Sequence, residues 1–268
     1  MSPRLTAADA AYTILATLGV PRRPTTVDGF LAGDPRTLVA GIAATMMATV
    51  DVLQRSVKQG ANLIVSHEPA FFDHHNAIID QLTAENDPVY SQKMDFIEKN
   101  HLVIWHLHDA LHDMRPDLID LGTIHQMGWN APDGLTYPGI LSVDPIAAAA
   151  LAAQMAKKLN ASSARFIGIP DMRVTRIGLA LGFRGSDTIR HLLQDPDVDA
   201  VIIGEAHEWE MGGYLADAVS LGMDKALIVL GHIPSEQYGM AEAATIIRTA
   251  LPDTPVSFIP CRDPYWAA

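Results

Sequence analysis

Three short runs of this chain are apolar at every position, and they constrain its fold more than any other feature. They cover residues 63–65, 201–203 and 227–230. A strand with one face in water alternates apolar and polar residues, whereas a strand covered on both faces by helices is apolar throughout. Helical segments with one apolar face alternate with short β-like runs along the chain. We therefore predict an α/β fold with helices flanking the sheets.

Local patterns add more specific expectations. Thr6 followed by Asp9 is typical of a helix capping box, so a helix should begin there. Asp144 and Pro145 suit the N-cap and first turn of a helix, which we expect over residues 146–159. A strand is expected at residues 37–41. The turn-forming residues 128–134 are the best candidate for a domain boundary.

Composition excludes several classes of protein. The 268 residues carry a net charge of −12, which argues against a general nucleic-acid surface or an anionic-membrane binder. Cys261 is the only cysteine, so neither an intramolecular disulfide nor a thiolate zinc site is possible. A reducing cytoplasm is the expected compartment. No stretch reaches the roughly 18 apolar residues of a membrane span.

Histidine points to the chemistry, because seven of the 11 histidines lie between residues 67 and 112. Neutral imidazole is a common ligand of divalent metals, and without thiolates a metal site must use His, Asp and Glu. Residues 62–69, 102–113 and 226–236 each place imidazoles and carboxylates just after an apolar run. Ligands bind at the carboxyl ends of strands in open α/β sheets, so we expect the three segments to converge on one site.

Several of these residues also have simpler interpretations. A single histidine at a strand end is usually a hydrogen-bonded structural residue, and we interpret five that way: His74, His75, His101, His125 and His191. His106 and His112 stay open between a structural and a site role. Residues 204–210 follow a strand and are acidic, but carboxylates are favoured in the first turn of a helix in any case.

The motifs resemble those of the Nif-three-like family of dinuclear-metal, ring-forming hexameric proteins, also named GTP cyclohydrolase I type 2. The resemblance rests on residues 48–53, 60–72, 104–109 and 231–236, where glycine-His followed by Ser-Glu is the most specific motif. It implies a two-domain fold with mixed sheets and a metal site at strand ends in the cleft between the domains. We expect residues 1–130 with 226–268 to form the metal-site domain and residues 131–225 a second α/β domain.

The resemblance also implies a set of ligands. His67, His232 and Glu236 match family ligands directly, and Asp109 is the best match for the family's aspartate. Glu68 stands where a second histidine is usual. A carboxylate there favours manganese, iron or magnesium relative to zinc, and it would either bridge two ions or reduce the site to one. His108 is a rival or additional ligand.

The implied function is that of a metal-dependent hydrolase. One or two divalent ions (Mn, Fe, Zn or Mg) would activate water, with Glu205 or His108 as candidate catalytic proton shuttles. The substrate would be a small molecule, nucleotide-like or heterocyclic. The alternative is a non-catalytic metal-binding or regulatory protein that uses the same ligands. In either case we expect a homo-oligomer, with the number six implied by the resemblance.

Overall fold

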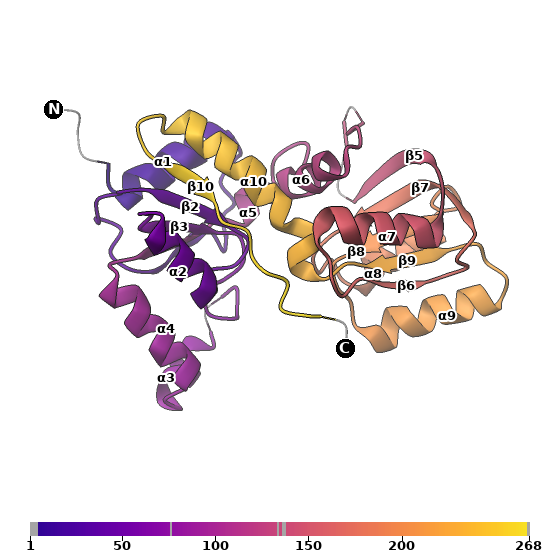
Figure 1. Cartoon of the computed structure of the whole chain (residues 1–268), viewed down its shortest axis with the longest axis horizontal. Coiled ribbons are helices and arrows are strands. Elements are labelled where there is room, and N and C mark those ends of the chain that lie inside the picture. Colours follow the sequence, from indigo (N-terminus) through magenta and orange to yellow (C-terminus); the bar gives the residue numbers. More distant parts are fainter. Residues whose placement is uncertain (1–4, 76, 133, 136–137, 267–268) are drawn as a thin grey trace. The chain divides into compact units, whose positions relative to one another are not determined.

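The computed structural model describes residues 5–75, 77–132, 134–135 and 138–266. The chain forms two compact units, each with its own five-stranded mixed sheet (Figure 1). The first unit contains described residues 5–114 and 240–261, and the second contains 115–239 and 262–266. The expected α/β fold with helices flanking mixed sheets is confirmed. The domain limits expected from the sequence stay a prediction.

The sheet of the first unit has the strand order β1-β4-β3-β2-β10. All neighbouring strands are parallel except β1, which is antiparallel to β4. The strands are β1 (Gly29–Ala32), β2 (Ile42–Thr45), β3 (Leu63–Ser66), β4 (Val103–His106) and β10 (Val256–Phe258). The helices are α1 (Ala7–Leu18), α2 (Val50–Lys58), α3 (Ile79–Ala84), α4 (Pro88–Lys99) and α5 (Asp109–His112), and α10 (His232–Ala250) contains the boundary between the units.

The register of the central strands brings two histidine-bearing segments to one edge of this sheet. Strands β2, β3 and β4 are buried at every position, as expected for strands covered on both faces. Ser66 pairs with His106, so β3 and β4 end at the same level. The residues that follow both strands therefore leave the sheet side by side.

The second unit has the strand order β5-β7-β8-β9-β6, in which the three central strands are parallel and the two outer strands antiparallel. The strands are β5 (Gly139–Ala147), β6 (Arg165–Ile167), β7 (Arg173–Ala180), β8 (Ala200–Ile203) and β9 (Ala226–Val229). The helices are α6 (Leu118–Met127), α7 (Ala148–Leu159), α8 (Ser186–Gln194), the π-helical turn η1 (Glu208–Gly212) and α9 (Gly213–Ser220).

Both faces of this second sheet are packed. Ile202 belongs to the core that contains Met155 of α7. Its neighbour Val201 belongs to a separate core with Leu192 of α8 and Leu215 of α9. Successive side chains of a strand point to opposite faces, so helices cover both sides of β8 (Figure 1). This packing explains the apolar run at residues 201–203.

Two local expectations are wrong, for reasons of tertiary pairing. Asp144 and Pro145 lie in β5, because Ile146 still pairs with Val174 of β7 and the helix begins only at Ala148. Pro145 falls in the irregular part of that pairing, where its missing N–H costs no ladder hydrogen bond.

The strand expected at residues 37–41 lies instead at β2. Leu38 makes only an isolated bridge to Thr6 and is 43% exposed, whereas all four residues of β2 are buried in the sheet. The capping box is confirmed, since Thr6 and Asp9 each accept the other's backbone N–H. Among the described residues, no helix is long and apolar enough to cross a membrane.

Candidate metal centre

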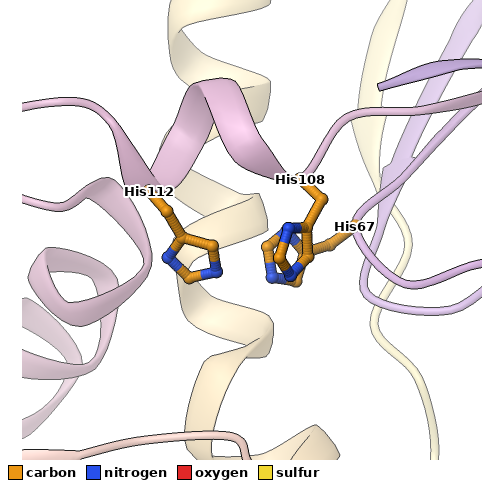
Figure 2. A group of neighbouring side chains, drawn as sticks. All are labelled: His67, His108 and His112. Atoms are coloured by element: carbon orange, nitrogen blue, oxygen red, sulfur yellow. The ribbon is translucent and has the colours of Figure 1, made fainter. Parts of the chain in front are cut away.

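Three imidazoles from two neighbouring strand ends meet in the first unit. His67 directly follows β3, while His108 and His112 stand at the start and end of α5, just after β4. One ring nitrogen from each lies within 4.8 Å of the others, a spacing that could hold a metal ion. The ring centroids are 4.6 Å apart for His67 and His108, and 4.7 Å apart for His108 and His112. Figure 2 shows the three rings grouped beneath α5.

A second group with metal-ligand spacing shares one member with the first. It contains Glu68, His74 and His108. The carboxylate of Glu68 is buried, and its Oε2 lies 3.3 Å from Nε2 of His74. Because His108 belongs to both groups, the cluster has the donors for one ion or for two neighbouring ions.

His106 lies beside the two groups, with its ring 5.5 Å from that of His74 and 5.9 Å from that of His108. Nδ1 of His106 lies 2.9 Å from the carbonyl oxygen of Val27. Among side chains of the described residues, Nε2 of His106 and Nδ1 of His74 are buried without a hydrogen-bond partner. Burial, and then the nearby His74, lower the pKa of His106, so its ring is held neutral. Neutral imidazole is the ligand form. Because His74 belongs to the second group and its buried Nδ1 has no hydrogen-bond partner, the residues present fit a divalent metal.

The short helix α5 is held by a carboxylate from outside it. Asp28 accepts the backbone N–H groups of His108 at 2.6 Å, Asp109 at 2.8 Å and Ala110 at 3.0 Å. A helix leaves its first N–H groups without internal partners, and a four-residue helix has little else to stabilise it. Asp28 therefore fixes the segment that carries His108 and His112.

Asp109, the aspartate expected as a ligand, has both carboxylate oxygens engaged. Oδ2 accepts from the Thr26 hydroxyl at 3.0 Å and the Val27 N–H at 3.2 Å. Oδ1 lies 2.9 Å from Nη1 of Arg23 and 3.1 Å from Nδ1 of His108. A carboxylate behind an imidazole orients the ring and raises its basicity. These contacts fit a role in orienting His108, and the ligand role of Asp109 stays a prediction.

A buried lysine supports the loop between Glu68 and His74. Lys93 of α4 is 4% exposed and donates to the carbonyl oxygen of Ala70. Its Nζ also lies 5.4 Å and 5.5 Å from the ring centres of Phe71 and Phe72. Burial lowers the pKa of Lys93 to about 8. The ammonium group thus holds the middle of a loop whose two ends contribute metal-capable side chains.

The remaining predicted site residues lie together in the second unit. Nδ1 of His232 is 2.7 Å from Oε1 of Glu205, and its Nε2 is 3.1 Å from Oε2 of Glu236. His232 and Glu236 are four residues apart on α10, so the helix places them on one face. Gly182 has a φ of 64°, and a Cβ there would overlap the Glu236 carboxylate. The close approach therefore requires glycine.

An arginine faces the buried carboxylates of this unit. Nη2 of Arg184 lies 3.7 Å from both Asp117 Oδ2 and Glu236 Oε1. Burial, and then the charge of Asp117, raise the pKa of Asp120 well above its ordinary value. A raised pKa favours the neutral form of Asp120, which limits the negative charge near Glu236.

The structure thus brings the predicted residues together as two sets. His67, Glu68, His108 and Asp109 form the set in the first unit, and Glu205, His232 and Glu236 form the set in the second. Their roles as ligands or proton carriers stay predictions.

Sequence reasoning did not assign two members of the cluster. The four-residue spacing of His108 and His112 would have suggested a shared helix face. From the sequence we interpret His74 as structural, because it has no local signal beyond the density of histidines around it.

Several solved structures share the fold. Staphylococcus aureus protein SA1388 is 16% identical with a TM-score of 0.75, covering 99% of this chain and 100% of its own. A Bacillus cereus protein related to NIF3 is 12% identical with a TM-score of 0.75, covering both chains fully. Reduced HcgD from Methanocaldococcus jannaschii is 14% identical with a TM-score of 0.67, covering 96% of this chain and 98% of its own. At these identities the similarity shows the fold alone. No curated protein matches the chain.

The sequence itself identifies the family. The model of the Duf34/NIF3 (NGG1p interacting factor 3) family matches residues 25–264. That span begins before β1, ends after β10, and includes both sets of site residues. The chain therefore belongs to the Duf34/NIF3 family.

Proposed function

We propose that the chain is a divalent-metal-dependent hydrolase that acts on a small molecule. The observation that carries the proposal is the meeting of His67, His108 and His112 at the carboxyl ends of two parallel strands. Three imidazoles at this spacing are typical of a metal site, and strand ends are where open α/β sheets bind ligands.

The proposed ligands come from both sets of residues. His67, His108 and His112 supply nitrogen donors, and Glu68 with His74 supplies the donors for a neighbouring position. We propose His232 and Glu236 as further ligands, as the family resemblance implies. When bound, one or two ions (Mn, Fe, Zn or Mg) supply Lewis acidity that polarises a substrate oxygen and acidifies water. The carboxylates favour Mn, Fe or Mg relative to Zn.

Glu205 is the proposed proton acceptor. Its side chain is 53% exposed, so it can exchange protons with solvent. Its contact with Nδ1 of His232 orients that imidazole, so one pair serves both positioning and proton transfer. His108 is the second candidate, but its membership of both metal-capable groups favours a ligand role.

A non-catalytic metal-binding or regulatory protein is the second candidate function. The observation that favours it is the complete burial of His67, because a closed site leaves little room for substrate. Such a protein would bind the same ions through the same residues without turnover.

Metal analysis combined with a panel of hydrolase substrates tests the proposal. We expect bound divalent metal and metal-dependent turnover in the wild type, and loss of both in His112→Ala and His232→Ala. His191→Ala is the matched control, since His191 lies exposed on α8. If the two site variants lose metal but the wild type shows no turnover, the result supports the non-catalytic regulatory protein. Wild-type metal content in both site variants contradicts the metal centre itself.

We also propose a cytoplasmic homo-oligomer, and the resemblance to ring-forming proteins supports a hexamer. Light scattering at micromolar concentration tests the assembly. A monomeric mass would contradict it.

A further inference from the structure

Three aromatic side chains of the second unit lie close together in the segments that follow β7 and β8. The rings of His207 and Trp209 are nearly parallel, at 8°, with centroids 6.2 Å apart. The ring of Phe183 lies 5.5 Å from that of His207. We call these three residues the aromatic ladder.

The side chains of the aromatic ladder are exposed, although the backbone that carries them is ordered. Trp209 is 79% exposed and Phe183 is 48% exposed, which is costly for large apolar rings. Trp209 lies within the π-helical turn η1, a type of turn that is frequent at functional sites. Phe183 follows Gly182, which packs against Glu236. The rings are therefore held in place by ordered backbone rather than carried by a loose loop.

A cavity of about 470 Å³ opens beside two rings of the ladder. Phe183, His207 and Tyr214 line it with aromatic surface. Its volume suits a small organic molecule, since ligand sites typically measure about 300–1,000 Å³. A planar ring in this cavity would have aromatic faces to stack on.

Two carboxylates and one arginine line the cavity, so acidic groups outnumber basic ones there. Glu210 accepts from the Ser186 hydroxyl, which lowers the pKa of that carboxyl and keeps it ionised, and its Oε1 lies 3.3 Å from Nδ1 of His207. Asp187 is a second carboxylate in the lining, and Arg190 is paired with it. Carboxylates accept hydrogen bonds from N–H groups and repel phosphates.

We propose that this cavity binds a planar heteroaromatic ring that has N–H donors on its edge and carries no phosphate. Stacking on Phe183 and His207 would hold the ring, and Glu210 with Asp187 would accept from its edge. His207 is two residues from Glu205, the proposed proton acceptor. That the ring is the substrate rests on the proposed function, whereas its binding does not.

Calorimetric titration of three probes into metal-loaded and metal-stripped protein tests the inference. Guanosine offers N–H donors without phosphate, caffeine is a planar purine without N–H donors, and GTP adds a triphosphate to guanosine. In the stripped protein we expect saturable binding of guanosine, and binding at least about tenfold weaker for the other two probes. Phe183→Ala and His207→Ala should each weaken guanosine binding about tenfold or more, as for loss of a stacked aromatic.

Trp266→Ala is the matched control, because Trp266 is equally exposed, at 79%, and lies outside the ladder. It should leave guanosine binding unchanged. Phe183→Leu keeps an apolar side chain without a π face and should weaken binding as Phe183→Ala does.

The inference is overturned if guanosine does not bind, if the ladder variants bind it as the wild type does, or if caffeine or GTP binds equally well. A drop in molecular mass on Trp209→Ala, without guanosine binding, would instead make the ladder a contact between copies of the chain. Guanosine binding by protein that takes up no metal would contradict the proposed function and leave this inference standing. Metal-dependent turnover without guanosine binding would support the proposed function and overturn this inference.

Discussion

Oδ1 of Asp28 accepts the backbone N–H of His108 at 2.6 Å. The same carboxylate also accepts the next two N–H groups of α5, so it caps the helix from a segment far away in the sequence. Helix α5 is too short to set its own geometry. The separation of His108 and His112 therefore depends on Asp28, and so does any metal that both would bind.

Asp28→Ala should weaken divalent-metal binding about 10- to 100-fold, the usual effect of removing a group that supports metal ligands. The reason is that three N–H groups lose their common acceptor and α5 loosens. Competition titration with a chelating dye measures the change. Asp34→Ala is the control. Asp34 is another aspartate of the same N-terminal region, and its side chain pairs with the exposed Arg36. Equal metal affinities in the two variants would contradict the role of Asp28 in holding α5.

Asp109→Asn should reduce metal affinity moderately and leave the number of bound ions unchanged. The amide keeps the side-chain shape, but it cannot strengthen the basicity of His108 as a carboxylate does. Asp113→Asn is the matched control, because it changes the second carboxylate that pairs with Arg23. Metal analysis by mass spectrometry gives the count. Loss of a whole ion per chain would show that Asp109 is itself a ligand.

The fold was predictable where continuous apolar runs in the sequence indicate buried strands. The apolar runs at residues 63–65 and 201–203 lie in strands, and so does the run at 227–230 except for Leu230, because strands covered on both faces are apolar throughout. The prediction failed around Pro145, where the local signals favour a helix start. There β5 continues because Ile146 pairs with Val174 on another strand. A local sequence pattern does not predict pairing with a strand that lies elsewhere in the sequence.

The site was predictable only as a region. The density of histidines marked the segment, because imidazole is a common metal ligand. The choice between Asp109 and His112 depends on which side chain α5 turns toward His67, and Asp28 fixes that helix from 80 residues away. His74 meets Glu68 only because the intervening loop folds back. Neither relationship leaves a pattern in a single sequence.

Lys93→Met should remove an increase in the free energy of unfolding that the wild type shows as pH rises. The pKa of Lys93 is about 8 in the folded protein and near its ordinary value of 10.5 in the unfolded chain. Between these values the unfolded chain binds more protons, so the free energy of unfolding rises as pH increases from 8 to 10.5. The total rise from this residue is at most about 3 kcal/mol, from the shift of the pKa.

Urea unfolding at several pH values between 7 and 10.5 measures that rise. Lys99→Met is the control, since Lys99 is an exposed lysine on the same helix, and it should keep the wild-type slope. If Lys93→Met shows the same slope as the wild type, burial does not set the pKa of Lys93.

Glu68→His tests the oxygen-rich character of the metal centre. The Glu68 carboxylate is buried 3.3 Å from His74, in a group with metal-ligand spacing, so we propose it as a ligand. Histidine replaces a hard anionic oxygen by a neutral nitrogen. Because nitrogen donors suit zinc and oxygen donors suit manganese and magnesium, the ratio of zinc to manganese affinity should rise.

Competition titrations with both ions on the wild type and on Glu68→His measure that ratio. Glu85→His is the matched control, since Glu85 is exposed at the end of α3, and it should leave the ratio at the wild-type value. His67 and Glu68 are neighbours, and in an extended segment their side chains would point in opposite directions. Both belong to metal-capable groups only because the chain turns directly after β3. An unchanged ratio in Glu68→His would mean that this turn serves His67 alone, and that the centre is built from imidazoles without the Glu68 carboxylate.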